Sequence, residues 1–443
     1  MTRSGWQAHT AHTGISIVKT SKALWSLLFP PNQLSNTIMR SSSTIALGAL
    51  AVLATFTSAC TSVSVPTSEG DVVGRTMELM GDLHDTWVGS THSRGEEMGA
   101  VGKQVCGTRT WTNKHGFFSV DLPDASVLPG LPTGVLGTDG MNEAGLSVSA
   151  QVLGASAGNY MVPGNSTGSS SLSVCWLEMV PWLLANFASI DELKSAFGDD
   201  NIAVVDVDTS TFRGEIMPVI RGLHWGVDDA QGNHAVLEVL GGTMRIHDNT
   251  VGVLTNDPPF PWHLDNINQY SNLSPRQGPP SSVAVNTEIG MVPKNTPGFG
   301  YNLKGMPGSF SPADRFVRMF YLKQHAGLLS PLSAIEEGIT VATGLLADTF
   351  IVKGTMPDLS TTTYSVLKVP SKQEYYYKTY GHDQWKRVQL SVLGKAGAFD
   401  QGAVPSVDTL SHGGPSVVDA TASFSRGAGA GSAASKVHLR GKA

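Results

Sequence analysis

The chain has 443 residues, a formal net charge of −6 and only 15% charged residues. This weakly acidic balance gives no sign of a nucleic-acid partner, and the 49 glycines indicate a loop-rich globular protein rather than a coiled coil or a disordered chain. No zinc-binding spacing and no glycine-rich phosphate loop after a strand is present, so we expect no metal and no cofactor.

An apolar stretch without charge covers residues 44–56, with Arg40 before it and the small residues 57–59 after it. At about 13 residues the stretch is short for a membrane span, which needs roughly 20. The order of a positive start, an apolar run and small residues is typical of a secretory signal peptide. We therefore predict a signal peptide over residues 39–59 and an exported protein, periplasmic or secreted. Residues 1–38 are either a second targeting segment or precede the true start.

Cleavage after Ala59 would make Cys60 the first residue of the mature chain, with its thiol and its α-amine on one residue. An α-amine titrates near neutrality, at roughly 7.7–8.0, so it can take the thiol proton. We interpret Cys60 as an N-terminal nucleophile. Three alternatives stay open: a lipid-bearing cysteine, one half of a disulfide, and an ordinary core residue. The only other cysteines are Cys106 and Cys175, which could form a single bridge.

Alternating and β-branched segments bounded by turn residues predict antiparallel strands. A hairpin over residues 63–79 would return Arg75 towards Cys60. The other expected strands lie at residues 110–120 (two short strands), within 138–149 (a turn that opens into a strand), and at 223–227, 235–240, 244–247, 251–255, 364–367 and 374–379. The segment from 223 to 255 is expected to be one meander.

Apolar residues at helical spacing predict four helices between these strands. We expect them at residues 172–187, from a cap at Ser189 to Phe197, at 312–325 and at 331–347. Two antiparallel sheets faced by helices fit this order of elements, which places the chain in the α+β class. One domain is expected over residues 60–397. Residues 398–443 are rich in Gly, Ala and Ser, so we predict a low-complexity tail there.

Four stretches share their order and spacing with a known family. They are residues 60–62 with 74–78, residues 139–146, residues 253–258 with 262–266, and residues 305–311 with 315–318. Together they resemble the choloylglycine hydrolase and penicillin V acylase family of linear-amide hydrolases, from Cys60 to about Tyr380. The resemblance implies a four-layer αββα sandwich, an N-terminal nucleophile, a thioester intermediate and no cofactor.

The resemblance also implies roles for single residues. Cys60 matches the nucleophile and Arg75 the arginine beside its thiolate. Glu78 stands where well-known members carry Asp, and would accept hydrogen bonds at the Cys60 amine. Asn256 matches the asparagine that donates to the oxyanion, a contact worth roughly 2.7–4 kcal/mol in comparable enzymes. It is also a natural turn former before Asp257.

Two further positions are less direct matches. Val152, or a neighbour, matches the second oxyanion donor and could offer only its backbone N–H, and Gln151 is the alternative if the register slips. Arg315 matches the family's arginine near the active site, but Asp314 precedes it where the family has Ser, and Ser309 replaces an Asp. The family-like residues Asn142, Trp225, Asn266 and the histidines at 224 and 263 are expected to be structural, with Asn142 fixing a turn.

These observations predict an exported amidase for small-molecule amides with an apolar acyl group and a small polar amine. Conjugated bile acids, penicillin V and acyl-homoserine lactones are the candidates, with a broad acylase favoured. One alternative is a lipid-anchored, non-catalytic binding protein on the same fold, which is the only case that involves a membrane. Another is an amidase of N-acylethanolamine-type lipids. By resemblance the protein would be a homo-oligomer, as a tetramer.

Overall fold

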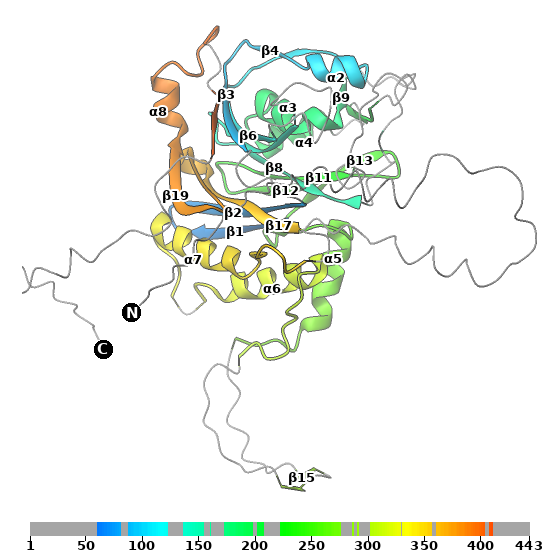
Figure 1. The fold of residues 1–443 in the computed structure, drawn as a ribbon, viewed down its shortest axis with the longest axis vertical. Coiled ribbons are helices and arrows are strands. Elements are labelled where there is room, and N and C mark those ends of the chain that lie inside the picture. Colours follow the sequence, from blue (N-terminus) through cyan, green and yellow to red (C-terminus); the bar gives the residue numbers. More distant parts are fainter. Residues whose placement is uncertain are drawn as a thin grey trace, which may run out of the picture. The chain divides into compact units, whose positions relative to one another are not determined.

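The computed structural model describes residues 60–80, 87–122, 136–154, 160, 172–197, 202–207, 222–275, 286–287, 290–291, 302–328, 330–356, 360–403 and 407–410. Within them, most strands belong to two large antiparallel sheets that pack face to face between outer helices (Figure 1). The expected α+β sandwich of four layers is confirmed.

Sheet A has six strands, and its order across the sheet is β14 (Val253–Leu254), β1 (Thr61–Thr67), β2 (Gly70–Met80), β17 (Ser360–Val369), β18 (Glu374–Thr379) and β19 (His382–Gln389). Sheet B has eight strands in the order β13 (Thr243–Asp248), β12 (His234–Leu240), β11 (Leu223–Asp228), β8 (Ser147–Val152), β7 (Leu136–Asn142), β6 (Phe117–Leu122), β3 (Val88–His92) and β20 (Val407–Thr409). Every residue of β17 is buried, as expected for a central strand covered on both faces.

The helices cover the outer faces of the two sheets. The described helices are α2 (Ala100–Val105), α3 (Met179–Asn186), α4 (Ile190–Phe197), α5 (Phe260–Ile267), α6 (Pro312–His325), α7 (Ile335–Ala347) and α8 (Leu390–Lys395), with short 3₁₀ turns at Trp176–Glu178, Asn268–Tyr270 and Pro370–Lys372. Helix α3 packs on β6, β7 and β8 of sheet B, whereas α6 and α7 pack on β1 of sheet A (Figure 1).

Two of the expected helices agree closely with the structure. Helix α6 has the predicted bounds, because Pro312 occupies its first turn and the Ser311 hydroxyl accepts the Asp314 N–H at 3.2 Å. Helix α4 ends at Phe197 as expected. Helix α7 begins at Ile335, later than the predicted position 331.

The hairpin of β1 and β2 is confirmed, and it is paired from Thr61↔Thr76 to Thr67↔Gly70. The late hairpin of β17 and β18 is confirmed as well. The two short strands expected within residues 110–120 exist but do not pair with each other. Strand β5 (Trp111–Thr112) pairs with β4 (Glu97–Met98), whereas β6 lies within sheet B.

The expected four-strand meander is wrong in its last strand. Strands β11, β12 and β13 are adjacent in sheet B, but β14 leaves them and pairs with β1 of sheet A, with Ser62 opposite Leu254. The change of sheet follows a turn in which the Gly252 N–H bonds Asn249 at its carbonyl (3.1 Å) and its side-chain oxygen (2.9 Å). Gly252 has a φ of 61°, which favours glycine. This crossing places the chain after β14 beside Cys60.

The helix expected over residues 172–187 is also wrong in its first part. Residues Leu172–Cys175 form β9, which pairs in parallel with β10 (Ile202–Val205), and the helix α3 begins only at Met179. An apolar run of this length has no periodicity that separates a buried strand from a buried helix. A short two-stranded ribbon, β15 (Asn286–Thr287) with β16 (Gly290–Met291), completes the described strands.

The domain extends past the expected boundary at residue 397. Phe399 is fully buried, β20 pairs with β3 at the edge of sheet B, and Leu410 is 2% exposed. These apolar side chains stand among small residues, and they anchor the chain to the sandwich. The prediction of a tail from residue 398 is therefore wrong up to residue 410, and residues 411–443 lie outside the described residues, as do 1–59.

The three cysteines resolve into one pair and one free thiol. Cys106, after α2, and Cys175, at the end of β9, form a disulfide with their Cα atoms 5.7 Å apart. Cys60 is free and buried. The bridge that the sequence left open is present, and Cys60 is not one half of a disulfide.

Candidate active site

Cys60 lies directly before β1, at the inner face of the sandwich, and is 1% exposed. Its Sγ is 3.5 Å from Met77 Sδ, 3.9 Å from the carbonyl oxygen of Glu78 and 3.9 Å from Nη2 of Arg75. The register of the hairpin explains this proximity, because Thr61 lies opposite Thr76. The expected return of Arg75 towards Cys60 is thus what the structure has, and Arg75 is fully buried.

Arg75 fills a gap between two strands of sheet B. Strands β7 and β8 pair only as far as Asp139 and Ser149, although both continue beyond these residues. In the opening, the guanidinium donates to the carbonyl of Thr138 at 2.8 Å and to the carbonyl of Ala150. The arginine therefore links sheet A to sheet B where the ladder separates.

The positive charge of Arg75 is stabilised by a buried cluster that contains a carboxylate and two tyrosine hydroxyl groups. Nη1 lies 3.2 Å from Asp139 Oδ2 and donates to the Tyr364 hydroxyl at 2.8 Å. Asp139 also contacts Lys368 Nζ at 3.2 Å and accepts from Tyr375 at 2.9 Å. Burial alone would lower the pKa of Arg75, but the charges of Tyr364, Cys60 and Asp139 outweigh it and raise the pKa, so the arginine stays a cation.

Glu78 lies on β2, three residues after Arg75, and is fully buried. The hydroxyl of Thr362 donates to its Oε1 at 2.6 Å and the hydroxyl of Thr76 to its Oε2 at 3.1 Å. Burial raises the pKa of Glu78 to about 7, although Thr362 and the charge of Arg315 act in the opposite direction. Its carboxyl group therefore changes charge near neutral pH.

Asn256 follows β14 and is 2% exposed. Its Nδ2 donates to the carbonyl oxygen of Val152 at 2.8 Å, and its Oδ1 accepts from Arg315 Nη2 at 2.9 Å. Because a guanidinium can only donate, the second contact fixes which end of the amide is the donor. The turn-forming and donor interpretations of Asn256 are compatible, since its side chain faces Val152 while its backbone turns towards α5.

Val152 ends β8, and the direction of its backbone follows from the ladder. The Leu153 N–H bonds the Gly222 carbonyl at 2.9 Å, so the neighbouring pair of Val152 and Leu223 is of the non-hydrogen-bonded kind. The N–H and the carbonyl of Val152 therefore both point away from β11, to the side where Asn256 lies. The side chain of Gln151 points elsewhere, since its Nε2 donates to the Ser62 hydroxyl at 2.6 Å.

Arg315 lies in the first turns of α6 and is fully buried beside Cys60. Its Nη1 donates to the carbonyl oxygen of Cys60 and to the Thr61 hydroxyl, both at 2.6 Å. Burial lowers its pKa to about 10, against the charges of Glu78 and Cys60. The preceding Asp314 does not draw the arginine away, because its carboxylate accepts from the Ser309 hydroxyl at 2.6 Å.

Cys60 and the five other residues singled out from the sequence thus lie together. Sequence reasoning missed the partners that hold them: Asp139, Tyr364, Lys368, Tyr375, Thr362 and Met77. Asp139 stood within the motif at residues 139–146, and its charge beside a buried arginine was the one available signal. Met77 stood within the motif at residues 74–78 with no role assigned to it, and the remaining partners come from β17 and β18, outside every motif.

Asn142 has the structural role expected for it. Its Nδ2 donates to the carbonyls of Leu184 at 2.8 Å and Phe187 at 2.7 Å, and its Oδ1 accepts the N–H groups of Ala144 and Leu146. It fixes the turn between β7 and β8 and anchors that turn to the end of α3.

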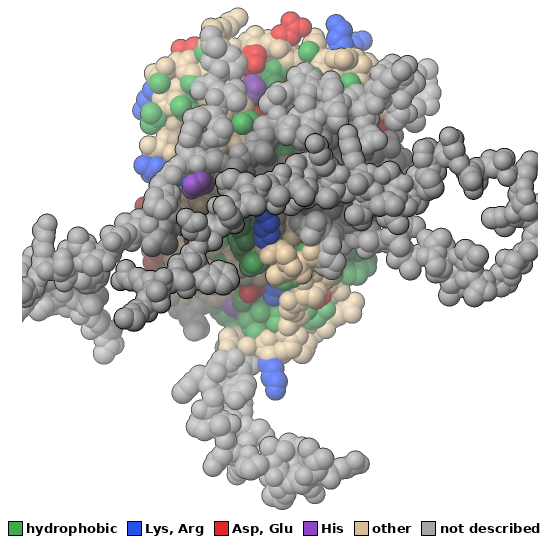
Figure 2. Space-filling model, viewed as in Figure 1, with side chains coloured by type: hydrophobic (Ala, Val, Ile, Leu, Met, Phe, Trp, Pro, Cys, Tyr) green, Lys and Arg blue, Asp and Glu red, His purple; other side chains and the backbone are tan. Residues whose placement is uncertain are grey.

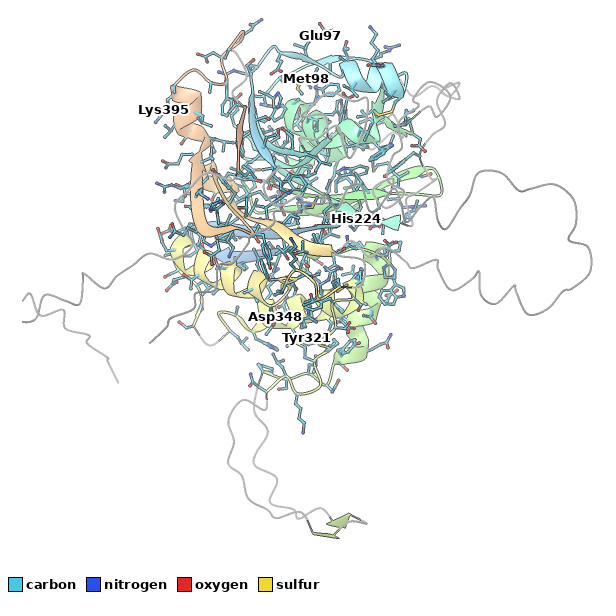
Figure 3. All side chains as sticks on the ribbon, viewed as in Figure 1. Glu97, Met98, His224, Tyr321, Asp348 and Lys395 are labelled. Atoms are coloured by element: carbon cyan, nitrogen blue, oxygen red, sulfur yellow. A yellow bond between two sulfur atoms is a disulfide. The ribbon has the colours of Figure 1, made fainter. Side chains whose placement is uncertain are left out.

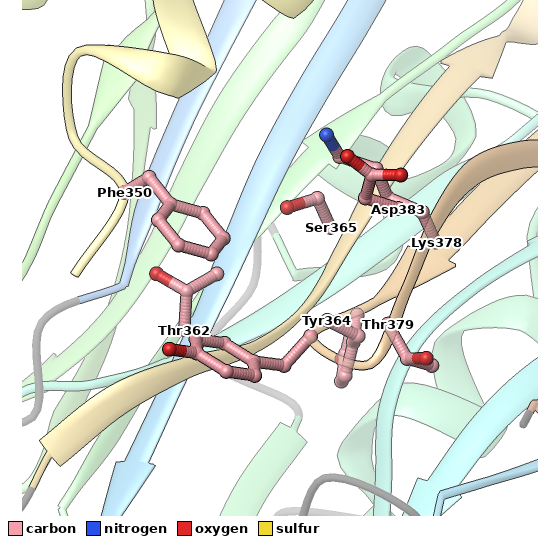
Figure 4. A pocket seen from close by; sticks show the side chains of 8 residues that line it. Phe350, Thr362, Tyr364, Ser365, Lys378, Thr379 and Asp383 are labelled. Carbon is pink, nitrogen blue, oxygen red and sulfur yellow. The ribbon is translucent and has the colours of Figure 1, made fainter. Parts of the chain in front are cut away.

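A small pocket lies beside this cluster but does not contain Cys60. Figure 4 shows its lining side chains: Phe350, Thr362, Tyr364, Ser365, Lys378, Thr379, Tyr380 and Asp383. Thr362 and Tyr364 line the pocket, and the same two residues hold Glu78 and Arg75. The pocket therefore adjoins the support of the site and not the nucleophile.

Among the described residues, no group of His, Cys, Asp and Glu side chains is arranged to hold a metal ion. The described helices include none with the length and hydropathy needed to cross a bilayer. On the face drawn in Figure 2, cationic and acidic side chains of the described part are interspersed, without a basic stripe.

Comparisons with known proteins agree with this fold. Residues 60–394 match the choloylglycine hydrolase family of linear amide C–N hydrolases. The chain is 31% identical over 257 residues to a bile salt hydrolase/transferase of Clostridium perfringens, which covers 57% of this chain and 72% of that protein. It is 29% identical over 216 residues to a penicillin V acylase of Pectobacterium atrosepticum, covering 48% of this chain and 46% of that one.

Solved structures show the same fold. A variant of conjugated bile acid hydrolase from Clostridium perfringens superposes with a TM-score of 0.62 at 24% identity, covering 81% of this chain and 99% of that one. Penicillin V acylase from Agrobacterium tumefaciens gives a TM-score of 0.55 at 18% identity, covering 79% and 90%. Fold and sequence together define a hydrolase of C–N bonds in linear amides. The chain belongs to the choloylglycine hydrolase family.

Proposed function

We propose that this protein is an exported cysteine amidase whose nucleophile is Cys60. The observation that carries the proposal is the arrangement around its thiol. Nη2 of Arg75 lies 3.9 Å from Sγ, and Arg315 contacts both the Cys60 carbonyl and the side chain of Asn256. A fixed positive charge next to a buried sulfur stabilises the thiolate, which is the reactive form.

The proposal requires removal of the residues before Cys60, so that its α-amine is free to act as the base. The amine takes the thiol proton, and Glu78, fully buried three residues after Arg75, is the proposed acceptor for the resulting ammonium group. The leader pattern at residues 39–59 supports this cleavage and export. The disulfide between Cys106 and Cys175 supports an oxidising compartment.

In the proposed reaction, Sγ attacks the amide carbonyl and an S–C bond forms. The developing oxyanion accepts hydrogen bonds from the Asn256 amide and from the Val152 N–H, which points to the side of its strand where Asn256 lies. The C–N bond then breaks, and the ammonium group of Cys60 gives its proton to the leaving amine. Water, deprotonated by the same amine, attacks the thioester and releases the acid, which restores the thiol.

The proposed substrates are linear amides of an apolar acyl group with a small polar amine. Similarity to a bile salt hydrolase/transferase and to a penicillin V acylase supports this class. We expect residues 79–91 and 154–171 to select the acyl group; of these segments, residues 81–86 and most of 155–171 lie outside the described residues. We retain a broad acylase as the proposal, with conjugated bile acids, penicillin V and acyl-homoserine lactones as the panel.

A lipid-anchored binding protein is the competing function, and the burial of Cys60 argues against it. Its Sγ is enclosed by Met77, Glu78 and Arg75 within 3.9 Å, so an acylglyceryl group on the sulfur would have to displace the Arg75 guanidinium. N-acylethanolamine-type lipids share the amidase chemistry and belong in the same panel.

The test combines the mass of the mature protein with release of free amine. We expect N-terminal sequencing to begin at Cys60 without added mass, and Cys60→Ala to abolish amine release from the substrates that the wild-type protein hydrolyses. Equal rates for the two proteins, or a lipid mass on Cys60, would refute the amidase proposal.

A further inference from the structure

Three polar side chains form a row across sheet B on the face that meets sheet A. They are Gln151 on β8, His224 on β11 and Glu238 on β12, and the register places His224 opposite both of the others. Each is at most 1% exposed. Polar groups in the middle of a sandwich destabilise the fold unless they are bonded, so the partners of this row indicate what it does.

The row bonds to the backbone that carries the site. His224, labelled in Figure 3, contacts the carbonyl oxygen of Thr255 through Nε2 at 2.9 Å, and Thr255 directly precedes Asn256. Glu238 Oε1 accepts the N–H of Phe260, the first residue of α5, at 2.9 Å. Between these two contacts lies the turn that presents Asn256.

The two side chains of this pair also bond to each other. His224 Nδ1 lies 3.0 Å from Glu238 Oε1, and both groups are fully buried. The Thr255 carbonyl can only accept, so Nε2 of His224 donates to it, and Nδ1 faces the Glu238 carboxyl group. Burial alone would raise the pKa of Glu238, but its hydrogen bond to His224 and the charge of that ring lower it. The two side chains form a buried pair that extends from sheet B to the turn.

A second histidine closes the turn from its far end. His263 Nε2 lies 2.9 Å from the carbonyl oxygen of Asn256, and the ring stacks on Phe316 with centroids 4.5 Å apart. Burial lowers the pKa of His263 to about 4, so the ring is neutral and Nε2 carries the donated hydrogen. The carbonyls on both sides of the Asn256 Cα are thereby fixed by imidazole groups.

We propose that His224 and Glu238 are positioning residues of the amidase reaction, which hold the backbone at Thr255 and Phe260 so that the Asn256 amide faces the oxyanion. The inference rests on the proposed role of Asn256. Arg315 fixes one end of this amide through Oδ1, and the His224–Glu238 pair fixes the chain from which the amide projects. An amide that is displaced by a fraction of an ångström stabilises a transition state less while binding substrate as before.

The experiment is a double-mutant cycle between Glu238→Gln and Asn256→Ala, with glycocholate or penicillin V, whichever the wild-type protein hydrolyses faster. Glu238→Gln keeps the shape and the acceptor for Phe260 but removes the charge. We expect it to lower kcat about 10-fold with KM within about 3-fold, as a share of the 10²–10³ that an oxyanion donor contributes. In the Asn256→Ala background the same change is expected to have no further effect, because the side-chain amide that Glu238 helps to position is absent.

The matched control is Asp71→Asn. Asp71 also pairs with a partly buried histidine across the two sheets, since its Oδ2 lies 2.8 Å from Nε2 of His234, but that pair does not contact the site. We expect it to lower thermal stability and leave kcat unchanged.

The outcomes distinguish the positioning role of His224 and Glu238 from the proposed amidase function. Three results would overturn the positioning role alone. Glu238→Gln could lower kcat equally in both backgrounds, or it could change only KM. It could also have no effect although Asn256→Ala is impaired. Full activity of Asn256→Ala or of Cys60→Ala overturns the proposed function on which it rests.

Discussion

The Arg315 guanidinium links the backbone of Cys60 to the side chain of Asn256. Its Nη1 lies 2.6 Å from the carbonyl oxygen of Cys60, and its Nη2 lies 2.9 Å from Oδ1 of Asn256. The planar fork of an arginine can hold two acceptors in a fixed relation, whereas a lysine ammonium is a point charge on a flexible stem. The nucleophile and the proposed oxyanion donor are therefore connected through one rigid group.

This arrangement predicts that Arg315→Lys lowers kcat although it keeps the positive charge. We expect a loss of 10- to 100-fold, because the lysine cannot reach both acceptors and the Asn256 amide is then held only through Nδ2. Steady-state kinetics measure it. The matched control is Arg318→Lys on the same helix, whose Nε lies 3.1 Å from Asp348 and which serves the loop at Pro307 and Ser309. If both variants lose the same activity, the effect belongs to α6 and not to the fork.

Glu78 predicts the acidic limb of the pH profile. Its pKa is raised to about 7 because burial disfavours the carboxylate, so the group is mostly protonated below that pH. If the carboxylate is needed beside the Cys60 amine, kcat/KM should rise as the pH increases towards 7 and then level off. In Glu78→Gln the rate should be lower throughout, and the limb near pH 7 should be absent. A limb that persists unchanged in this variant would assign it to another group.

The site could be predicted from the sequence where it depends on local geometry. The turn at Gly70 sets the register of β1 and β2, and this register alone brings Arg75 to Cys60. The place of Asn256 depends on the long-range pairing of β14 with β1, which no periodicity within residues 251–255 reveals. The resemblance of motifs supplied that residue, and the meander expected from its pattern was wrong.

The supports of the site could not be predicted, for a related reason. Arg75 occupies the opening between β7 and β8, and the point at which a ladder separates depends on the packing of the whole sandwich. Phe399 shows the same limit at the other end of the chain. It is a single large apolar residue in a stretch of small ones, and only its burial against the sandwich reveals that the domain continues.

The cross-sheet pair of His234 predicts how stability depends on pH. Asp228 and Asp71 each lie 2.8 Å from a ring nitrogen. Burial alone would lower the pKa of His234, but these two carboxylates raise it to about 9. A raised histidine pKa stabilises the fold fully below the unfolded value near 6.5, and this contribution is lost as the pH rises through about 9. The expected loss is about 3 kcal/mol in the free energy of unfolding.

Urea unfolding at pH 6 and pH 10 measures this loss. In Asp71→Asn the difference between the two pH values should shrink, since one of the two partners no longer favours the cation. The same pH dependence in this variant as in the wild-type protein would assign the effect to other groups.

The disulfide predicts the response of the fold to reduction. Cys106 and Cys175 are 69 residues apart and join the end of α2 to the end of β9. Closing a loop of this length restricts the unfolded chain and is worth roughly 4 kcal/mol in the chain-entropy estimate. We expect Cys106→Ala with Cys175→Ala to lower the free energy of unfolding by that order, and a reductant to bring the wild-type protein to the same value.

Because neither cysteine contacts Cys60, the folded double variant should keep its kcat. A reductant that leaves the wild-type stability unchanged would contradict the presence of the bridge, whereas a variant that is stable but inactive would contradict its separation from the site.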